Sequence, residues 1–473
     1  MSFTQPHSLM FHFNAPPPLS LYIHFPWCVR KCPYCDFNSH AVRGDIPEDQ
    51  YVDALLADLE SDLPRVWGRP VRSVFLGGGT PSLFSPEAIE RLLAGVRARV
   101  TLVPEAEITL EANPGTIAAP AHPAPATHMD VQVSREAGSR ERPAFAHPCA
   151  AETERFRGYR TAGVNRLSIG VQSFQPGQLQ KLGRIHGRDE AIAAAQAARA
   201  AGFDNFNLDL MFGLPQQTLE EALADLRTAL SLNPTHLSLY QLTLEPNTIF
   251  HAQPPELPDE DVLAAMQETL QAELAIAGFS QYEVSAYARA GQEPKCREAH
   301  GCASVTEGRT PGAAEAHGSA RVAAGHRCRH NLNYWQFGDY LGIGAGAHAK
   351  ITAADTITRL WKLKQPRDYL ATAGTPGVLG GEHQLAKEDV AFEFMLNVLR
   401  LTEGFPPMLF AERAGLPFAE IETALARAMA RGLVEQTHER IRPTALGLRF
   451  LNDLIALFLP EGESPSPAGR HKH

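Results

Sequence analysis

The chain has 473 residues, of which 44% are hydrophobic, and a formal net charge of −10. This length suggests about two to four domains, and the acidic balance argues against a nucleic-acid-binding protein, whose surface is usually basic. No apolar run reaches the roughly 18 residues that span a bilayer, and residues 1–20 lack the basic and apolar regions of a signal peptide, so we expect a cytoplasmic protein.

Short apolar strands alternate with helical segments between residue 19 and about residue 288. This alternation predicts an α/β fold of parallel strands with right-handed crossovers. Six such units predict a partial (β/α)6 barrel, and a full eight-unit barrel is the alternative. The strands are expected at Leu19–Phe25, Ser73–Gly77, Glu107–Glu111, Arg166–Val171, Asn205–Met211 and His236–Leu244, with helices at Tyr51–Leu63, Pro86–Val100, Ala191–Ala201 and Leu219–Leu232.

Two of these helices carry start signals. Ser85 followed by Pro86 is the pattern of an N-cap residue and a first helical residue. Thr218 with Glu221 has the spacing of a capping box. Both signals support the expected helix boundaries.

Two segments interrupt the alternating pattern. Residues 117–152 are rich in Ala, Pro, His and charge, and residues 291–327 contain no Leu, Ile, Phe, Met, Trp or Tyr. Neither can bury enough apolar surface to offset the entropy lost on ordering, so we expect disordered insertions. The expected regions are an N-terminal tail 1–18, the barrel 19–288 with an insertion at 117–152, a second insertion 289–327, a linking segment 328–387, a C-terminal domain 388–460 and a disordered tail 461–473.

The last third of the chain is mostly helical. Helical segments Val390–Leu401, Pro407–Ala414 and Phe418–Arg431 precede the strand-like stretch Leu433–Ile441 and a last helix, Ala445–Phe458. Helices followed by a small hairpin resemble a winged-helix module. Such modules often bind DNA, but no helix here is strongly basic, so we expect a packing or docking domain.

Three cysteines lie within eight residues, directly after the first expected strand. Cys28, Cys32 and Cys35 have C-x3-C-x2-C spacing. Three thiolates on one loop can bind three irons of a [4Fe–4S] cluster and leave the fourth iron without a protein ligand. A zinc site completed by His24 or His40 is the alternative, although zinc loops usually combine two C-x2-C pairs. We expect the cluster, with an open iron for a small-molecule ligand.

Glycines and polar residues mark the ends of the following strands. Leu76–Ser82 contains three consecutive glycines, which let backbone groups approach a ligand closely. Glu111, Gln172 and Asp209 lie at the ends of three successive strands, where parallel α/β sheets bind their ligands. Taken alone, each feature is equally compatible with a turn or a structural polar group. After the cysteine triplet, we expect a ligand site.

The triplet resembles the hallmark of the radical S-adenosylmethionine (radical SAM) superfamily. The resemblance implies that the amino and carboxylate groups of SAM bind the open iron, and that an electron from the cluster cleaves the sulfonium to a 5′-deoxyadenosyl radical. It assigns no single catalytic residue. The residues implied to hold SAM are Tyr22, Tyr34, Gly78, Gly79, Thr80, Glu111, Gln172, Arg184 and Asp209.

Five motifs resemble one branch of that superfamily, the oxygen-independent coproporphyrinogen III oxidase group. They are Tyr22–Cys28, Gly77–Ser82, Glu111–Gly115, Ser168–Phe174 and Asp209–Pro215. The match runs from about residue 19 to 459 apart from the insertions. The branch contains oxidases, which decarboxylate coproporphyrinogen III, and heme chaperones, which deliver heme.

Two departures disfavour the oxidase. The oxidases carry a fourth cysteine at C-x-C spacing after the triplet, where this chain has Phe37, and an N-terminal extension, where this chain has about 18 residues before the first strand. The heme chaperone is therefore the leading hypothesis and the oxidase is the alternative. A winged-helix regulator that senses iron or redox state is a third hypothesis, which the net charge disfavours.

The stretch His330–Trp335 matches an H-N-x-x-Y-W motif associated with the chaperones. The resemblance implies that His330, Asn331, Tyr334 and Trp335 contact heme, since an imidazole can bind the iron and aromatic faces can stack on the porphyrin. Taken alone, the stretch is equally compatible with a surface turn that enters the core. His348, after a glycine-rich run, is a candidate second iron ligand.

The expected ligands are therefore a [4Fe–4S] cluster, SAM and heme. The resemblance also implies heme-accepting partners such as membrane-bound respiratory cytochromes, with peripheral contact at the membrane, and it allows for a dimer. We expect no nucleic-acid partner. A zinc or heme-regulatory site is a weaker alternative for the cysteines and histidines near the second insertion, Cys296, His300, Cys302, His326 and Cys328.

Overall fold

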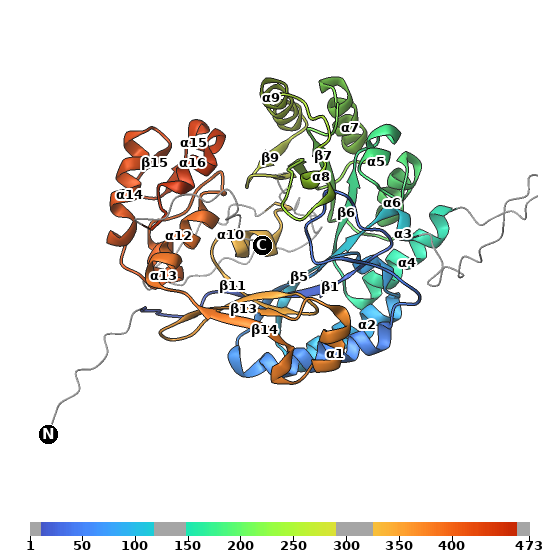
Figure 1. Cartoon of the computed structure of the whole chain (residues 1–473), viewed down its shortest axis with the longest axis horizontal. Coiled ribbons are helices and arrows are strands. Elements are labelled where there is room, and N and C mark those ends of the chain that lie inside the picture. The colour runs from blue at the N-terminus through green and yellow to red at the C-terminus, as the bar shows by residue number, and fades with distance from the viewer. Residues whose placement is uncertain (1–10, 118–147, 290–324, 461–473) are drawn as a thin grey trace, which may run out of the picture.

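The computed structural model describes residues 11–117, 148–289 and 325–460 (Figure 1). Its main feature is a curved twelve-stranded sheet with the strand order β14-β13-β12-β11-β1-β4-β5-β6-β7-β8-β10-β9. The first part of the chain contributes β1 (Leu19–Phe25), β4 (Val71–Gly78), β5 (Leu102–Ala112), β6 (Arg166–Gln172), β7 (Phe206–Phe212) and β8 (His236–Gln241). These six strands are parallel to one another, which confirms the six expected units rather than eight.

Six further strands extend this sheet at its two ends. β11 is parallel to β1, and the other added pairings are antiparallel. The added strands are β9 (Phe279–Gln281), β10 (Ala286–Arg289), β11 (Asp339–Ile343), β12 (His348–Thr352), β13 (Ile357–Lys362) and β14 (Leu379–Gln384). In the described chain β9 and β14 remain unjoined, so the barrel is open.

Helices cover the outer face of the curved sheet, as Figure 1 shows. They are α1 (Glu48–Asp62), α2 (Pro86–Arg99), α4 (Pro148–Ala162), α6 (Arg188–Ala200), α7 (Leu219–Ser231) and α9 (Glu260–Ile276). The side chain of Ser85 accepts the Ala88 N–H, and Thr218 and Glu221 form the expected capping box. Strand β1 is buried over almost its whole length, which explains its nearly continuous apolar sequence.

A second apolar core lies in the mostly helical C-terminal part. It is built on α12 (Lys387–Val398), α13 (Met408–Ala414), α14 (Ala419–Ala430) and α16 (Leu451–Ala456), with α15 (Ala445–Arg449) and a two-stranded sheet of β15 (Val434–Gln436) and β16 (Ile441–Pro443). The expected last helix is divided at Phe450. None of the helices in the described ranges has both the length and the apolar composition of a membrane span.

Three expectations about the irregular segments need correction or lie outside the described residues. The expected insertion 117–152 ends earlier than predicted, because α4 begins at Pro148. The expected N-terminal tail contributes Phe11 to the C-terminal core, where it is 2% exposed. Residues 118–147, 290–324 and 461–473 are not described, so the predicted disorder there lies outside the structure. The region boundaries at 288, 327 and 387 remain our proposal.

Short helix α10 (Arg329–Trp335) connects the two cores. It contacts β1, β4 and β11 of the sheet and α12 of the C-terminal part. Phe337, just after it, packs edge-to-face against Phe394 with ring centroids 5.8 Å apart. The helix therefore carries its aromatic side chains between the sheet and the C-terminal helices.

Candidate functional site

The three clustered cysteines lie on a loop that follows β1 and is held by one short strand pair. Cys28 ends β2 (Trp27–Cys28), which pairs with β3 (His40–Ala41). All three thiols are half-buried. Burial raises the pKa of the Cys28 and Cys35 thiols above the usual value.

A polar group lies near each sulfur, and two of the three come from outside the cysteine loop. Thr80 Oγ1 donates to Cys28 Sγ at 3.4 Å, and Arg184 Nη1 donates to Cys32 Sγ at 3.7 Å. Ser39 Oγ lies 3.8 Å from Cys35 Sγ. Hydrogen bonds to sulfur tune iron–sulfur clusters, so this environment fits the cluster that the spacing predicts.

A cavity of about 310 Å³ opens beside the cysteines. The ends of β4, β5, β6 and β7 line it, as expected for the carboxyl ends of parallel strands. Every candidate SAM residue except Tyr22 lines this first cavity: Tyr34, Gly78, Gly79, Thr80, Glu111, Gln172, Arg184 and Asp209. Tyr22 lines the adjoining second cavity, and its contact with SAM remains a prediction.

The glycines at the end of β4 let its backbone approach β1 and the cysteine loop closely. Gly78 has φ +111°, and a Cβ atom there would lie 2.5 Å from the His24 ring. A Cβ atom on Gly79 would lie 2.6 Å from the Trp27 carbonyl oxygen. Only glycine fits both positions, which leaves backbone groups exposed to the cavity.

Charged side chains at the first cavity have unusual environments. Arg184 Nη2 donates to the Gly170 carbonyl at 2.7 Å, whereas its buried Nε has no hydrogen-bond partner among the described residues. Burial, together with the nearby Asp209, raises the pKa of Glu111 to about 8, against one opposing hydrogen bond from Gly78 N. A guanidinium group and a carboxyl group in the lining of one cavity fit a zwitterionic ligand such as an amino acid.

Gln172 ends β6 in a left-handed conformation, with φ +69°. Such a conformation is costly for a residue with a side chain, and it is concentrated at functional sites. Gln172 lines the first cavity, where the bend places it beside Gly170 and Arg184.

A second cavity, of about 450 Å³, adjoins the first and shares Phe37, Gly78 and Glu111 with it. Aromatic side chains form much of its wall: Tyr22, Phe37, Phe75, Tyr334, Trp335, Phe337 and Tyr340. Its polar groups include His24, His348, Lys31 and Lys364. The cavity therefore combines flat apolar surfaces with imidazoles and cations.

Two of the four candidate heme residues line the second cavity, and the other two do not. Tyr334 and Trp335 line the second cavity, whereas His330 and Asn331 line neither cavity. The His330 ring is buried behind Phe75, on which it stacks at 4.2 Å between centroids. The surface turn considered as an alternative is absent, because the stretch is helical.

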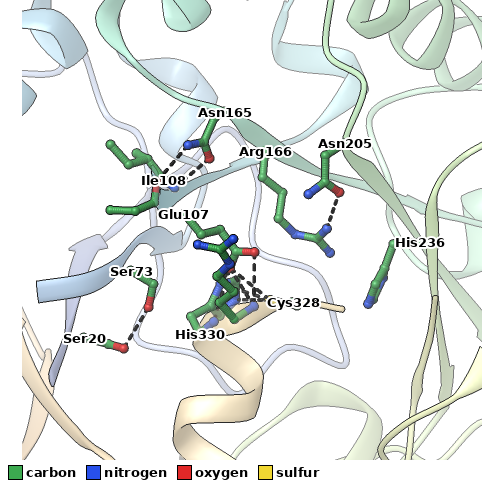
Figure 2. Close-up of polar contacts among 12 residues, drawn as sticks. Ser20, Ser73, Glu107, Ile108, Asn165, Arg166, Asn205, His236, Cys328 and His330 are labelled. Carbon is green, nitrogen blue, oxygen red and sulfur yellow. Dashed lines mark hydrogen bonds and ion pairs between the residues drawn. The ribbon is translucent and has the colours of Figure 1, made fainter. Parts of the chain in front are cut away.

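His330 belongs to a polar cluster with Glu107 and Cys328, shown in Figure 2. His330 Nδ1 lies 3.1 Å from Glu107 Oε1, and Cys328 Sγ lies 3.1 Å from the same nitrogen. The Glu107 carboxylate also accepts the backbone N–H groups of Arg329 and His330, at 2.9 and 3.2 Å. Glu107 thus holds the start of α10, a role that no local sequence signal indicates.

The two histidines considered as a fourth zinc ligand differ, because the buried Nε2 of His40 has no hydrogen-bond partner among the described residues, whereas His24 is engaged. Both ring nitrogens of His24 are hydrogen-bonded, Nδ1 to Tyr22 Oη at 2.8 Å and Nε2 to the Asn38 carbonyl at 2.9 Å.

Of the cysteines considered for a second zinc site, Cys328 lies with Glu107 and His330 in a group that could hold a metal ion. Cys296, His300 and Cys302 lie outside the described residues. Cys328 is buried in the Glu107 cluster.

Comparisons with known proteins agree with this geometry. The model of the radical SAM superfamily matches residues 22–229, and the HemN C-terminal domain matches residues 385–450. The heme chaperone HemW of Escherichia coli is 45% identical over 94% of this chain and 99% of its own length, and that of Haemophilus influenzae is 43% identical over the same shares. Coproporphyrinogen III oxidase (HemN) of Escherichia coli has a TM-score of 0.67 and 24% identity, covering 94% of this chain and 90% of its own, which shows the shared fold.

Proposed function

This chain belongs to the HemW family of radical SAM proteins, and we infer that it is a heme chaperone that binds a [4Fe–4S] cluster, SAM and heme and delivers heme to acceptor proteins. The observation that carries the proposal is the pair of adjoining cavities. One is lined by three cysteines and the Arg184 side chain, and the other is lined by aromatic rings. A cluster with its ligand and a flat macrocycle match these two linings.

We assign the cluster to Cys28, Cys32 and Cys35. SAM is assigned to the residues of the first cavity, with the Arg184 guanidinium toward its carboxylate and the backbone at Gly78 and Gly79 toward its amino group. When bound, the cluster and SAM supply one-electron chemistry. The residues of this chain hold and orient them, and Thr80 and Arg184 donate hydrogen bonds to the sulfurs.

We further propose that the acceptors include membrane-bound respiratory cytochromes, that the chain works in the cytoplasm with peripheral contact at the membrane, and that it can form a dimer. These proposals rest on the family resemblance. Loading the chain with heme and mixing it with membranes that contain an apo-cytochrome tests them. Transfer of heme to the membrane fraction supports the acceptor, and heme retained on the chain contradicts it.

The assignment of function is tested by assaying heme binding and porphyrinogen decarboxylation side by side on anaerobically reconstituted protein. We expect heme binding without conversion of coproporphyrinogen III. Conversion with consumption of SAM, in protein that does not retain heme, would establish the oxidase instead.

The cluster ligands are tested on the same preparation. Cys28→Ala is expected to abolish bound iron and sulfide, whereas Cys328→Ser serves as the matched control and keeps both, because Cys328 lies outside the first cavity. Iron and sulfide that survive the loss of Cys28 would contradict the assignment.

A further inference from the structure

Behind the first cavity, the barrel interior between β7 and β8 is polar rather than apolar. Asn207 and His236 are partners in the register of these two strands, and Asp209 and Ser238 are the partners two positions further on, on the same face. Asp209 lines the cavity, whereas Asn207 and His236 are 2% and 1% exposed and do not reach it. Buried polar side chains need hydrogen-bond partners, so the role of this face depends on where its hydrogen bonds lead.

The Asn207 amide has its nitrogen toward Asp209 and its oxygen toward β8. Asn207 Nδ2 lies 2.8 Å from Asp209 Oδ1 and 2.8 Å from Ser168 Oγ. Because a carboxylate oxygen only accepts hydrogen bonds, the atom that faces it has to be the amide nitrogen. The amide oxygen then accepts a hydrogen bond from Ser238 Oγ at 3.2 Å and lies 2.7 Å from His236 Nδ1.

This orientation determines the tautomer of His236. Burial lowers the pKa of His236 well below its ordinary value, so the ring is neutral and carries one hydrogen. Because Asn207 Oδ1 is an acceptor, the hydrogen is on Nδ1, and Nε2 accepts a hydrogen bond from the Tyr282 hydroxyl at 2.8 Å. Tyr282 Oη in turn accepts the backbone N–H of Cys328 at 3.2 Å.

A buried series of hydrogen bonds therefore leads from the start of α10 to the first cavity. Each member donates in the same direction, from the Cys328 N–H through Tyr282, His236 and Asn207 to Asp209. Hydrogen bonds that follow one another in this way polarise and strengthen each other in a buried environment. The loss of one member weakens the last bond of the series, the one that the carboxylate accepts.

The Asp209 carboxylate depends on these donors. Burial raises the pKa of Asp209, and hydrogen bonds from Ser168, Asn207 and Ser238 oppose the rise. The other titratable groups that act electrostatically with it are Arg166, Glu111 and Tyr240. The oxygen positions that the donors leave free face the cavity, where they can accept a hydrogen bond from a ligand.

We propose that His236 is a positioning residue of the SAM site: it holds the Asn207 amide that donates to Asp209, and Tyr282 connects this series of hydrogen bonds to the start of α10. The inference rests on the proposed assignment of Asp209 to SAM. It adds to that site two residues, His236 and Tyr282, that lie outside the lining of its cavity.

The role of His236 is tested by equilibrium dialysis of SAM against the full chain after anaerobic reconstitution, with iron and sulfide measured in every variant. His236→Leu is expected to weaken SAM binding about tenfold, or ~1.4 kcal/mol, as for a weakened hydrogen bond to a charged group. His236→Asn is expected to bind SAM within about twofold of wild type, because its amide nitrogen can donate in place of Nδ1.

Tyr282→Phe tests the far end of the series. It is expected to weaken SAM binding about threefold, because the imidazole remains but loses the donor that selects its tautomer. Tyr369→Phe is the matched control. Its hydroxyl is equally buried and donates to Asp58 at 2.8 Å, outside the lining of both cavities, so SAM binding should stay at the wild-type value.

The pH dependence of SAM binding separates positioning from a loss of packing. With weaker donors Asp209 is less ionised, so it raises the pKa of Glu111 less, and that pKa falls from about 8. The pH midpoint at which Glu111 changes the SAM affinity should therefore move downward in His236→Leu. It should stay at the wild-type value in His236→Asn and Tyr369→Phe.

Each outcome decides one point. A wild-type chain that loads the cluster but binds no SAM refutes the proposed SAM site itself. If the wild-type chain binds SAM, equal affinity in His236→Leu overturns the role of His236, and weaker binding with an unmoved pH midpoint overturns it as well. Should His236→Leu fail to load the cluster, Tyr282→Phe decides, and an affinity equal to that of Tyr369→Phe overturns the proposal.

Discussion

Glu107 and Glu111 are four residues apart on β5 and lie on the same face of the strand. Glu107 is buried and Glu111 is half-buried at the cavity wall, and their carboxyl groups differ in charge. Burial by itself acts to raise the pKa of both carboxyl groups. For Glu107, hydrogen bonds from His330 and the Arg329 backbone, with the nearby Arg166 charge, reverse this effect and lower the pKa to about 2. Glu111 accepts one hydrogen bond, from Gly78 N, and its pKa is about 8. The number of donors decides whether a buried carboxyl is ionised.

The two ends of the strand therefore serve different purposes. At the Glu107 end, α10 supplies the donors and the carboxylate holds the helix in place. At the Glu111 end, two cavities meet and the carboxyl is left neutral beside them. Perturbed carboxyl groups of the second kind are typical of ligand sites, whereas those of the first kind are typical of structural networks.

Removing the charge at the Glu107 end is expected to have the largest effect on stability. Glu107→Gln leaves buried Arg166 and the start of α10 without their carboxylate, at a cost of about 3–5 kcal/mol. Glu111→Gln at pH 7 should cost less than about 1 kcal/mol, because the carboxyl there is mostly protonated already. Urea unfolding measures both variants, and equal losses would contradict the comparison.

Lowering the pH is expected to reduce the free energy of unfolding through the Glu107 carboxyl group. The folded-state pKa of Glu107 lies below its ordinary value of 4.5, so its contribution of about 3 kcal/mol is present above about pH 5 and is lost as the pH falls toward 2. The difference in unfolding free energy between wild type and Glu107→Gln should therefore shrink over this range. A difference that is constant with pH would show that Glu107 is not ionised in the folded chain.

At the Glu111 end, alkali rather than acid should change ligand binding. Above about pH 8 Glu111 ionises, and a carboxylate attracts the sulfonium cation of SAM, so its affinity should rise by about tenfold, or ~1.4 kcal/mol. Equilibrium dialysis from pH 6.5 to 9.5 measures this rise. Glu111→Gln should remove the part of the rise that is due to Glu111, while the rise persists in Glu107→Gln.

The smallest expected effect concerns the neighbour of Glu111. Asp209 is one of the groups that raise the pKa of Glu111, so Asp209→Asn should move the pH midpoint of SAM binding downward by less than about one unit. The hydrogen bonds from Ser168 and Asn207 to residue 209 allow an isosteric amide there. A midpoint that moves upward would exclude this electrostatic coupling.

Much of the first cavity could be predicted because its parts are close in sequence or lie at strand ends. Cys28, Cys32 and Cys35 occupy eight residues of one loop, so their proximity follows from covalent connection. Glu111, Gln172 and Asp209 lie at the carboxyl ends of parallel strands, which fold topology gathers at one edge. Tyr22 lies on β1 and lines the adjoining cavity, so its contact with SAM remains a prediction.

The heme residues were harder to predict, since the motif His330–Trp335 specifies a helix but not the direction of its side chains. One turn of α10 separates a histidine facing β5 from the tyrosine and tryptophan that line the second cavity. His348 gave a weaker signal in the sequence, yet it lines that cavity.

By itself, the sequence determined the six strand–helix units, the cysteine spacing and the run of three glycines, because periodicity, covalent distance and backbone freedom are local properties. Only the tertiary structure decided the pairing of Glu107 with His330 across 223 positions in the chain, and the shared wall of the two cavities. These depend on sheet register and on the packing of α10 against β4, which join segments that no local pattern relates.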